Sequence, residues 1–205
     1  LAEKNTLEDF NAETYTLPNN YQSVENITAL ERGMSSNYTQ AAVLSEALAS
    51  LYKEGDLRLD AYFKAADKNG YRFSQKSGKD DFRCSFRVGE MYLNSAEAAA
   101  QSDQLPQART RLLELMQKRY TPEAYTVKAT AVNAMNKEAL IQEILDERAR
   151  ELAFEGHRWF DLRRTTRPRI EKVLKGGTYV LEQDDSRYTI QIPREAIAAN
   201  PELSN

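Results

Sequence analysis

The sequence contains very few of the residues that build metal and thiol chemistry. Its 205 residues include one cysteine, Cys84, and one histidine, His157. A single cysteine cannot form an intrachain disulfide, and zinc sites and most acid–base catalysts use clusters of His or Cys. We therefore expect no metal site and no cofactor, and a chain that is stable without covalent cross-links.

Long apolar runs and an excess of positive charge are absent as well. No run approaches the ~18 apolar residues that span a bilayer, and the opening LAEKNTLEDF lacks the features of a signal peptide. The 28 Lys and Arg residues against 31 Asp and Glu give a net charge of −3, without the basic clusters that nucleic acid requires. The composition predicts a globular domain that does not bind nucleic acid. The first residue is Leu, and we expect the chain to be part of something longer.

The first 85 residues carry weak patterns. Residues 1–38 are rich in Asn, Thr, Ser, Glu and Tyr and predict an irregular, loop-rich lead-in. Between residues 39 and 53, Ala, Leu and Tyr recur at helical spacing, which predicts a helix that stops at Gly55. Between residues 55 and 84, Asn69-Gly70 and Ser77-Gly78 bracket short aromatic pieces and suggest a small hairpin or an extended loop.

Two helices are then predicted as an antiparallel pair. RVGEMYLNSAEAAAQ has a helical stripe of small residues, SDQLP interrupts it, and Pro106 begins a second helix with Ala108, Leu112 and Leu115 on one face. A turn this short forces the helices to pack against each other. Tyr92 followed by a contact of the Ala108 type is typical of a tetratricopeptide pair. Only one such pair is visible, whereas solenoids need about three.

The last third of the chain predicts two more helices and a β-hairpin. TPEAYTVKATAVNAM is predicted irregular, and Asn136 is predicted to cap a helix that ends at Gly156. HRWFDLRRT predicts a shorter helix, and TYVLEQDDSRYTIQIP predicts two strands about an Asp-Asp turn. A final short helix runs from Pro193 to Asn200-Pro201. The predicted fold is mostly α with a minor β element.

In residues 147–164, ERARELAFEGHRWFDLRR, charged and bulky apolar residues alternate more tightly than a simple amphipathic helix requires. Glu147, Glu151 and Glu155 are spaced by four and lie near one helical face. Two neighbouring carboxylates can act as a general acid and base, but nearby arginines favour ion pairing instead. A di-iron site is excluded because Phe154, not Glu, precedes His157 by three residues. Trp159 could stack on a sugar ring, but its neighbours favour a place in the core.

Three strings make the sequence similar to a known family. RVGEMYLNSAEAAAQ, ALIQEILDERARELAFEGHRWFDLRR and YTIQIPREAIAANPELSN resemble, in this order and spacing, the C-terminal region of the SusD/RagB family of outer-membrane nutrient-binding lipoproteins. LYKEGDLRLDAYF resembles the D-x-R segment that precedes it in that family. The similarity covers about residues 45–205, and residues 85–205 form the most recognisable part.

The resemblance implies a non-enzymatic binding protein. Such proteins cover a SusC-like TonB-dependent transporter, capture glycans or other nutrients at the cell surface and deliver them to the channel. It also implies an α superhelix of tetratricopeptide-like pairs, and a lipid anchor that holds the whole protein on the outer membrane. Family members are typically more than twice as long, so we expect residues 1–205 to be a single C-terminal domain that lacks the N-terminal half of the family and its anchor.

Two groups of residues follow as candidates. The family motifs are interpreted as scaffold, in which Trp159 packs in the core and charged residues form interhelical ion pairs. These charged residues are Glu90, Glu97, Glu147, Arg148, Glu151, Arg158 and Asp161. Ligand contacts are expected on loops, where ring faces and amides gather before residue 40. These loop candidates are Tyr15, Tyr21, Tyr38, Asn19, Asn20 and Asn37.

Two alternatives remain open. The chain could be a helical-repeat scaffold that binds protein without glycan affinity, in which case the helix pair at residues 87–119 should expose an apolar groove. It could instead be a glycoside hydrolase that uses Glu147 and Glu151. These two project from one helix a turn apart, whereas hydrolases place their carboxylates on opposite walls of the site.

Overall fold

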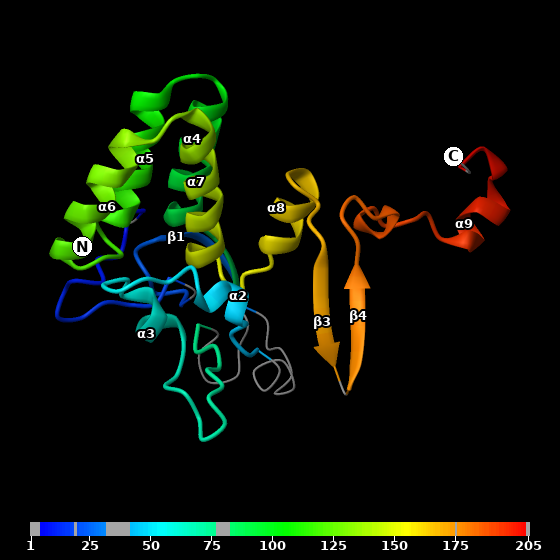
Figure 1. The fold of residues 1–205 in the computed structure, drawn as a ribbon, viewed down its shortest axis with the longest axis horizontal. Coiled ribbons are helices and arrows are strands. Elements are labelled where there is room, and N and C mark those ends of the chain that lie inside the picture. The colour runs from blue at the N-terminus through cyan, green and yellow to red at the C-terminus, as the bar shows by residue number, and fades with distance from the viewer. Residues whose placement is uncertain (1–4, 19, 32–41, 77–82, 175, 204–205) are drawn as a thin grey trace. The chain divides into compact units, whose positions relative to one another are not determined.

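A computed structural model of the protein describes residues 5–18, 20–31, 42–76, 83–174 and 176–203 (Figure 1). The chain divides into two compact units, Leu1–His157 and Arg158–Asn205, here called unit 1 and unit 2. The assignment of residues 1–205 to a single domain stays a prediction.

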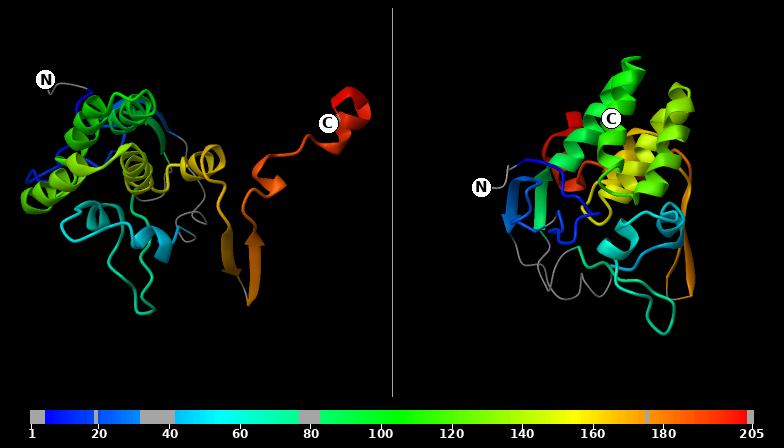
Figure 2. Two further views of the ribbon diagram at one scale, coloured as in Figure 1. Left: turned by 45° about the horizontal axis from the view of Figure 1, so that its top comes forward. Right: turned by 90° about the vertical axis from the view of Figure 1, so that its left-hand side faces the viewer.

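Unit 1 is mostly helical. In chain order its elements are β1 (Asn26–Glu31), α2 (Glu46–Ala49), α3 (Arg58–Tyr62), β2 (Arg83–Arg87), α4 (Val88–Gln101), α5 (Leu105–Met116), α6 (Pro122–Ala134) and α7 (Lys137–Glu151). Helix α4 packs against both α5 and α7, and α6 packs against α5, as the green helices in Figures 1 and 2 show. The two strands form an antiparallel pair that the sequence did not reveal.

The predicted helix pair is present as α4 and α5. Ala96, Ala100 and Ala108 are fully buried, so small side chains allow the two helices to approach closely. The first turn of α5 contains Pro106, whose missing N–H needs no partner there. Together with α7 the pair encloses the larger core, which the following residues form: Leu93, Ala96, Ala99, Ala100, Ala108, Leu112, Leu115, Met116, Tyr120, Val132, Leu140 and Ile144.

Helix α7 begins where its cap was predicted. The side chain of Asn136 accepts a hydrogen bond from the backbone N–H of Ala139 at 2.9 Å. The helix ends at Glu151 rather than at Gly156, because Phe154 and Gly156 both adopt positive φ angles in the turn that follows. This turn places Glu155 beside the end of the helix, where it contributes to the site below.

The predicted helix at residues 39–53 is mostly wrong. Residues 39–41 lie outside the described residues, and beyond them only Glu46–Ala49 is helical. Val43 instead forms a β-bridge with Phe73, and Leu44 donates its N–H to the carbonyl of Arg72 at 2.8 Å. These pairings with a distant segment override the local helical period.

The small hairpin predicted after Gly55 is present around Asn69-Gly70. Lys64 donates its N–H to the Phe73 carbonyl at 2.9 Å, and Gly70 has a φ of +82°, as a tight turn requires. Ser77-Gly78 lies outside the described residues. Residues 64–73 are called the 64–73 hairpin from here on.

The segment predicted as irregular after residue 120 is the helix α6, so that prediction is wrong. The side chain of Thr121 accepts a hydrogen bond from the N–H of Ala124, and Pro122 occupies the first helical position. Threonine and valine weaken the apolar period of this segment, and only Val132 of the helix is fully buried. Capping and packing against α5 are sufficient to hold it.

Unit 2 contains the predicted short helices and a β-hairpin. Its elements are α8 (Arg158–Arg164), β3 (Ile170–Leu174), β4 (Gly177–Leu181), the 3₁₀ turn η1 (Ser186–Tyr188), α9 (Arg194–Ala199) and the 3₁₀ turn η2 (Pro201–Leu203). The hairpin is confirmed, but its strands lie earlier in the chain than predicted. β3 pairs with β4, whereas the predicted Asp184-Asp185 turn leads into η1 because Asp185 accepts the N–H of Arg187 at 2.8 Å.

The mostly α fold, with its helix pair and small hairpin, agrees with the sequence prediction. In the described part of the chain, none of the helices is long and apolar enough to span a bilayer.

Candidate functional site

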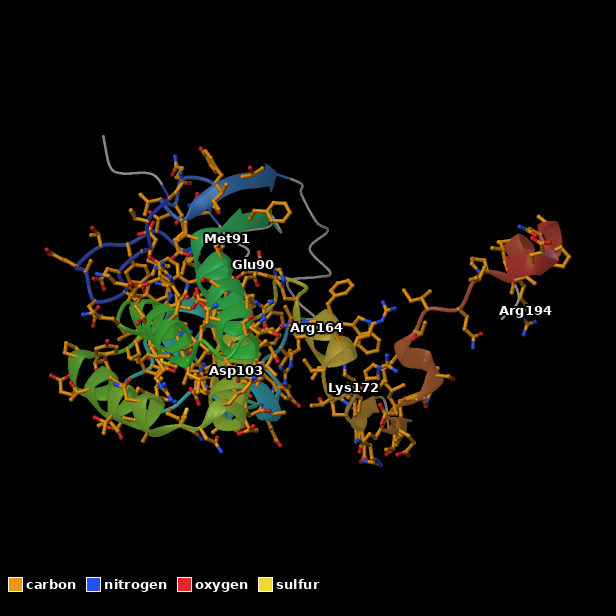
Figure 3. The ribbon with its side chains drawn as sticks, turned by 90° about the horizontal axis from the view of Figure 1, so that it is seen from above. Glu90, Met91, Asp103, Arg164, Lys172 and Arg194 are labelled. Carbon is orange, nitrogen blue, oxygen red and sulfur yellow. The ribbon has the colours of Figure 1, made fainter. Side chains whose placement is uncertain are left out.

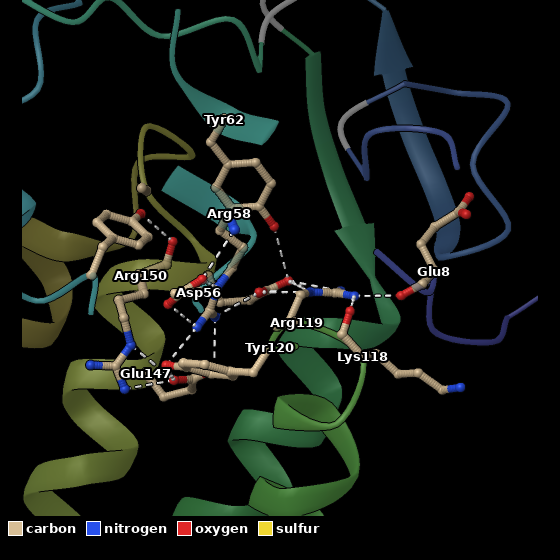
Figure 4. Close-up of polar contacts among 12 residues, drawn as sticks. Glu8, Asp56, Arg58, Tyr62, Lys118, Arg119, Tyr120, Glu147 and Arg150 are labelled. Atoms are coloured by element: carbon tan, nitrogen blue, oxygen red, sulfur yellow. Dashed lines mark hydrogen bonds and ion pairs between the residues drawn. The ribbon is translucent and has the colours of Figure 1, made fainter. Parts of the chain in front are cut away.

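Unit 1 contains an extensive buried ion cluster where α3, α7, β2 and the end of α5 meet (Figure 4). It combines five carboxylates with five cations, so the buried charges balance. Its members, called the ion cluster, are Glu25, Asp56, Arg58, Lys76, Arg87, Arg119, Glu147, Arg150, Glu151 and Glu155. Charges removed from water in this way are tolerated only when each one is paired.

Glu151 is the centre of the ion cluster. Its carboxylate accepts hydrogen bonds from Arg87 at 2.7 Å, from Arg58 at 3.0 Å and from Arg119 at 3.0 Å. Burial alone would raise the pKa of this carboxyl group, but the three guanidinium groups hold it well below its usual range. One helical residue therefore ties together three segments that are far apart in the sequence.

Glu147 lies one turn earlier on α7 and is held in the same way. It accepts hydrogen bonds from Arg58 at 2.7 Å and from Arg150 at 2.6 Å. Burial would raise its pKa, but Arg58 and Arg150 lower the pKa of Glu147 to about 2. The Tyr120 hydroxyl accepts a hydrogen bond from Arg58 at 3.0 Å and so provides a further buried partner for this guanidinium.

Glu155, the third of the glutamates spaced by four, lies in the turn that follows α7. It pairs with Arg87 at 2.8 Å and with Lys76, whose ammonium also donates to the carbonyls of Glu151 at 2.7 Å and Ala153 at 3.1 Å. The Glu151 carbonyl is at the C-terminus of α7, where backbone acceptors lack an intrahelical partner and a cation is favoured. Burial would raise the pKa of Glu155, but Arg87 and Lys76 lower it to about 2.

The glycoside hydrolase hypothesis does not fit this geometry. The side chains of Glu147 and Glu151 are 0% exposed, and both carboxylates are ionised and saturated by arginines. A glycosidase needs one carboxyl group that stays protonated near neutral pH and a second that faces the substrate. Neither Glu147 nor Glu151 stays protonated near neutral pH, and neither is exposed to a substrate.

The other residues of the family motifs lie at different places. On α4, Glu97 lies 3.9 Å from Arg148, which also donates to Asn94 at 2.6 Å. Glu90, labelled in Figure 3 near the start of α4, lies 3.8 Å from the imidazole of His157.

The motif residues of unit 2 start and fill α8. Arg158 begins the helix, and Asp161 pairs with Arg164 at 2.7 Å. Trp159, interpreted above as a core residue, is instead 37% exposed and stacks on Tyr188 with ring centroids 5.1 Å apart. Tyr188 comes from η1, so this contact links the first and later parts of unit 2.

Six members of the ion cluster were missed by sequence reasoning: Glu25, Asp56, Arg58, Lys76, Arg87 and Arg119. Signals existed for three of them, since Asp56 and Arg58 belong to the D-x-R segment and Arg87 begins the string RVGEMYLNSAEAAAQ. The approach of the backbone to the ion cluster depends on Gly89. A Cβ atom at this position would lie 2.5 Å from a guanidinium nitrogen of Arg87 and 3.0 Å from Glu151 Oε1.

The loop before β1 carries those ligand candidates that the structure describes. Tyr15 is 40% exposed, and its ring stacks on Phe10 with centroids 4.5 Å apart. Phe10 is buried and contacts Tyr62 of α3 edge-on. The Arg119 guanidinium lies over the Phe10 ring, 4.5 Å from its centroid, in a cation–π contact. The exposed Tyr15 ring is thus connected, through Phe10, to Arg119 of the ion cluster.

Tyr21 and Asn20 lie further along the same loop. Tyr21 is 52% exposed, and its hydroxyl accepts a hydrogen bond from the Gln22 side chain at 3.2 Å. Asn20 accepts the N–H of Gln22 at 3.0 Å through its side chain and a hydrogen bond from Asn26 through its carbonyl. Asn20 therefore shapes the turn. Asn19, Asn37 and Tyr38 lie outside the described residues.

A pocket of about 810 Å³ lies between residues 53–55 and α6. It is lined by Lys53, Glu54, Gly55, Tyr120, Thr121, Glu123, Ala124, Val127, Lys128 and Ala131. The protein-binding hypothesis placed an apolar groove on the helix pair at residues 87–119, and this pocket lies instead on the neighbouring helix. In the described part of the chain, no group of three or more His, Cys, Asp and Glu side chains could hold a metal ion.

Comparisons with known proteins agree with the fold. A SusD-like carbohydrate-binding protein from Bacteroides vulgatus ATCC 8482 matches with a TM-score of 0.60 and 18% identity, over 91% of this chain and 50% of that one. A SusD superfamily protein from Bacteroides fragilis matches with a TM-score of 0.61 and 21% identity, over 93% of this chain and 49% of that one. The chain thus spans about half the length of these structures. No curated protein matches it.

The family comparison covers nearly the whole sequence. The SusD family matches residues 10–205, which include the helix pair, the α7 motif, and the C-terminal helix of unit 2. The chain belongs to the SusD family.

Proposed function

We propose that this chain is the carbohydrate-binding part of a cell-surface nutrient-binding protein and acts by recognition without catalysis. The observation that carries the proposal is the exposed Tyr15 ring, held on Phe10 at the surface of a SusD-family chain. Pyranose rings present apolar C–H faces, and an exposed aromatic ring is the usual platform for them. The structural neighbour from Bacteroides vulgatus is a SusD-like carbohydrate-binding protein, which is consistent with this class of ligand.

The packing of Phe10 beneath Tyr15 favours binding because it lowers the conformational entropy that the Tyr15 ring loses when a ligand binds. Phe10 is only 5% exposed, and the Arg119 guanidinium lies against its ring. A side chain already fixed in place loses little conformational entropy when a ligand arrives. Under this proposal, the ion cluster acts as the rigid support of the binding surface.

We further propose that the protein delivers its ligand to a SusC-like TonB-dependent transporter. In that role the whole protein is lipid-anchored at the outer membrane and faces the outside of the cell. Both statements follow from family membership and the resemblance of the motifs. Co-purification of the whole protein with a SusC-like transporter from detergent-solubilised outer membranes is the expected result. Recovery of the protein without any transporter would contradict the delivery step.

Affinity gel electrophoresis tests the binding proposal. The native chain should migrate more slowly in gels that contain the polysaccharide it recognises, chosen from α-glucan, β-glucan, mannan, xylan and arabinogalactan. The polysaccharide should be recovered at its original length, as expected of a binder without hydrolytic activity. Unchanged mobility in all five gels would contradict carbohydrate binding.

A second function, protein binding, is favoured by the pocket between residues 53–55 and α6. Val127 is 72% exposed in its lining, which also includes Ala124 and Ala131 of the same helix. An exposed apolar surface of this kind can accept a side chain of another protein. Under this alternative, Val127→Asp abolishes partner capture, and the chain shows no affinity for any of the five polysaccharides.

A further inference from the structure

We propose that Asp60 and Arg72, together with the outer face of Tyr15, form a subsite for a neutral sugar that presents two adjacent free hydroxyl groups. This inference rests on the proposed carbohydrate-binding function and specifies which part of the surface recognises the ligand, and by which chemistry. Asp60 belongs to α3, Arg72 to the 64–73 hairpin and Tyr15 to the N-terminal loop.

The Arg72 guanidinium is fixed by several backbone carbonyls. Its Nε donates to the Lys64 carbonyl at 3.0 Å, and its Nη2 donates to the Leu59 carbonyl at 3.1 Å and to Asp60 Oδ1 at 2.6 Å. The Arg72 side chain is 23% exposed, so most of it is held against α3 and the base of the hairpin. A guanidinium anchored in this way presents its remaining nitrogen in one orientation.

The pair retains one donor and one acceptor that face no partner. Among the described residues, neither Arg72 Nη1 nor Asp60 Oδ2 makes a hydrogen bond, and the Asp60 side chain is 89% exposed. A guanidinium can only donate and a carboxylate can only accept. Adjacent sugar hydroxyls complement this arrangement, because one can donate to the carboxylate while its neighbour accepts from the guanidinium.

Aromatic contacts connect the Tyr15 ring to α3, the helix that carries Asp60. Burial and the negative charge of Asp60 raise the pKa of Tyr15. Tyr15 also rests on Phe10, which contacts Tyr62 on the same short helix that carries Asp60. Figure 1 shows the N-terminal segment, in blue, passing beside α3. Under this proposal, a sugar ring stacked on the outer face of Tyr15 meets the Asp60–Arg72 pair at its edge.

The charge of the subsite selects neutral sugars. Asp60 is far more exposed than Arg72, so an approaching ligand meets the carboxylate first. The carboxylate of a uronic acid at this position would face a like charge, which disfavours binding. We therefore expect a neutral hexose or pentose unit to be preferred over a uronic acid.

Isothermal titration calorimetry of the native chain tests the subsite. The probes are hexasaccharides of glucose, mannose, xylose and galactose, with hexagalacturonate as the charged comparison. At least one neutral probe should bind, and hexagalacturonate should bind at least ~10-fold more weakly. Asp60→Asn should weaken the neutral probe ~10-fold or more, because a hydrogen bond to a charged group is lost. Tyr15→Ala should weaken it by a similar factor, and Tyr15→Phe by much less.

A matched control is Asp103→Asn. Asp103 follows the C-terminal end of α4, its side chain is 77% exposed, and it pairs with Lys137 at 2.7 Å (Figure 3). This variant should bind as the native chain does, and circular dichroism should show that every variant is folded. Native affinity in both Asp60→Asn and Tyr15→Ala would overturn the subsite while leaving carbohydrate binding intact. Tighter binding of hexagalacturonate would overturn the selectivity. Failure of all probes to bind the native chain would overturn the proposed function and, with it, the subsite.

Discussion

Replacing Glu151 by glutamine should severely destabilise unit 1. The native carboxylate is 0% exposed and accepts hydrogen bonds from Arg58, Arg87 and Arg119 at distances of 2.7 to 3.2 Å. Glutamine keeps the shape but removes the negative charge, and its NH₂ group would face a guanidinium. Removing one partner of a buried pair costs about 3–5 kcal/mol, because the remaining charge is left uncompensated. Since domains are stable by only about 5–15 kcal/mol, this loss is a large fraction of the total.

Urea unfolding followed by circular dichroism measures this loss directly. The matched control is Glu114→Gln, because Glu114 pairs with Arg111 at 2.9 Å on the surface, with about 40% of each side chain exposed. Exposed pairs of this kind contribute less than ~1 kcal/mol. If Glu151→Gln lowered the free energy of unfolding by no more than this control, the argument that the ion cluster holds the unit together would be refuted.

Three further predictions concern stability. The pKa values of Glu147 and Glu155 are about 2 in the folded chain against 4.5 for a free side chain, so the stability they add is complete above pH ~4.5 and is lost as the pH falls toward 2. Urea midpoints measured between pH 7 and pH 3 should fall accordingly, and a flat profile would contradict this. Gly89→Ala should cost about 2 kcal/mol in urea unfolding, because the new Cβ would lie 2.5 Å from Arg87 Nη1. Helix propensity alone predicts the opposite sign, so a stabilised variant would show that the close contact is absent. Asn136→Ala should lower the melting temperature through a cap loss of about 1 kcal/mol, whereas Asn136→Asp should restore most of it.

The sequence was informative wherever local signals and tertiary packing agree. The α4–α5 pair and the start of α7 combine an apolar period with a proline or an asparagine at the helix start, and these features were predicted at the right place. Helix α6 was missed because its threonines and valines obscure the apolar period. Thr121-Pro122 was the available signal, since it forms the cap and first position of this helix.

The sequence did not indicate which charges pair with each other in the ion cluster. Glu147 and Glu151 belong to a recognisable motif, and their spacing placed them on one helical face. Their partners Arg58 and Arg119 come from distant segments, and no period in a single sequence indicates which distant charges will meet. The same limit applies to the ligand surface, where Tyr15 was a candidate but only the fold connects it, through Phe10 and Tyr62, to the helix that carries Asp60.

Amide hydrogen exchange with and without a bound neutral hexasaccharide locates the binding surface. The ligand should slow exchange in residues 10–16 and 57–72, which carry Tyr15, Asp60 and Arg72, while exchange in α7 stays unchanged. Protection confined to residues 53–55 and α6, or no protection at a saturating concentration of a hexasaccharide that binds, would contradict this prediction.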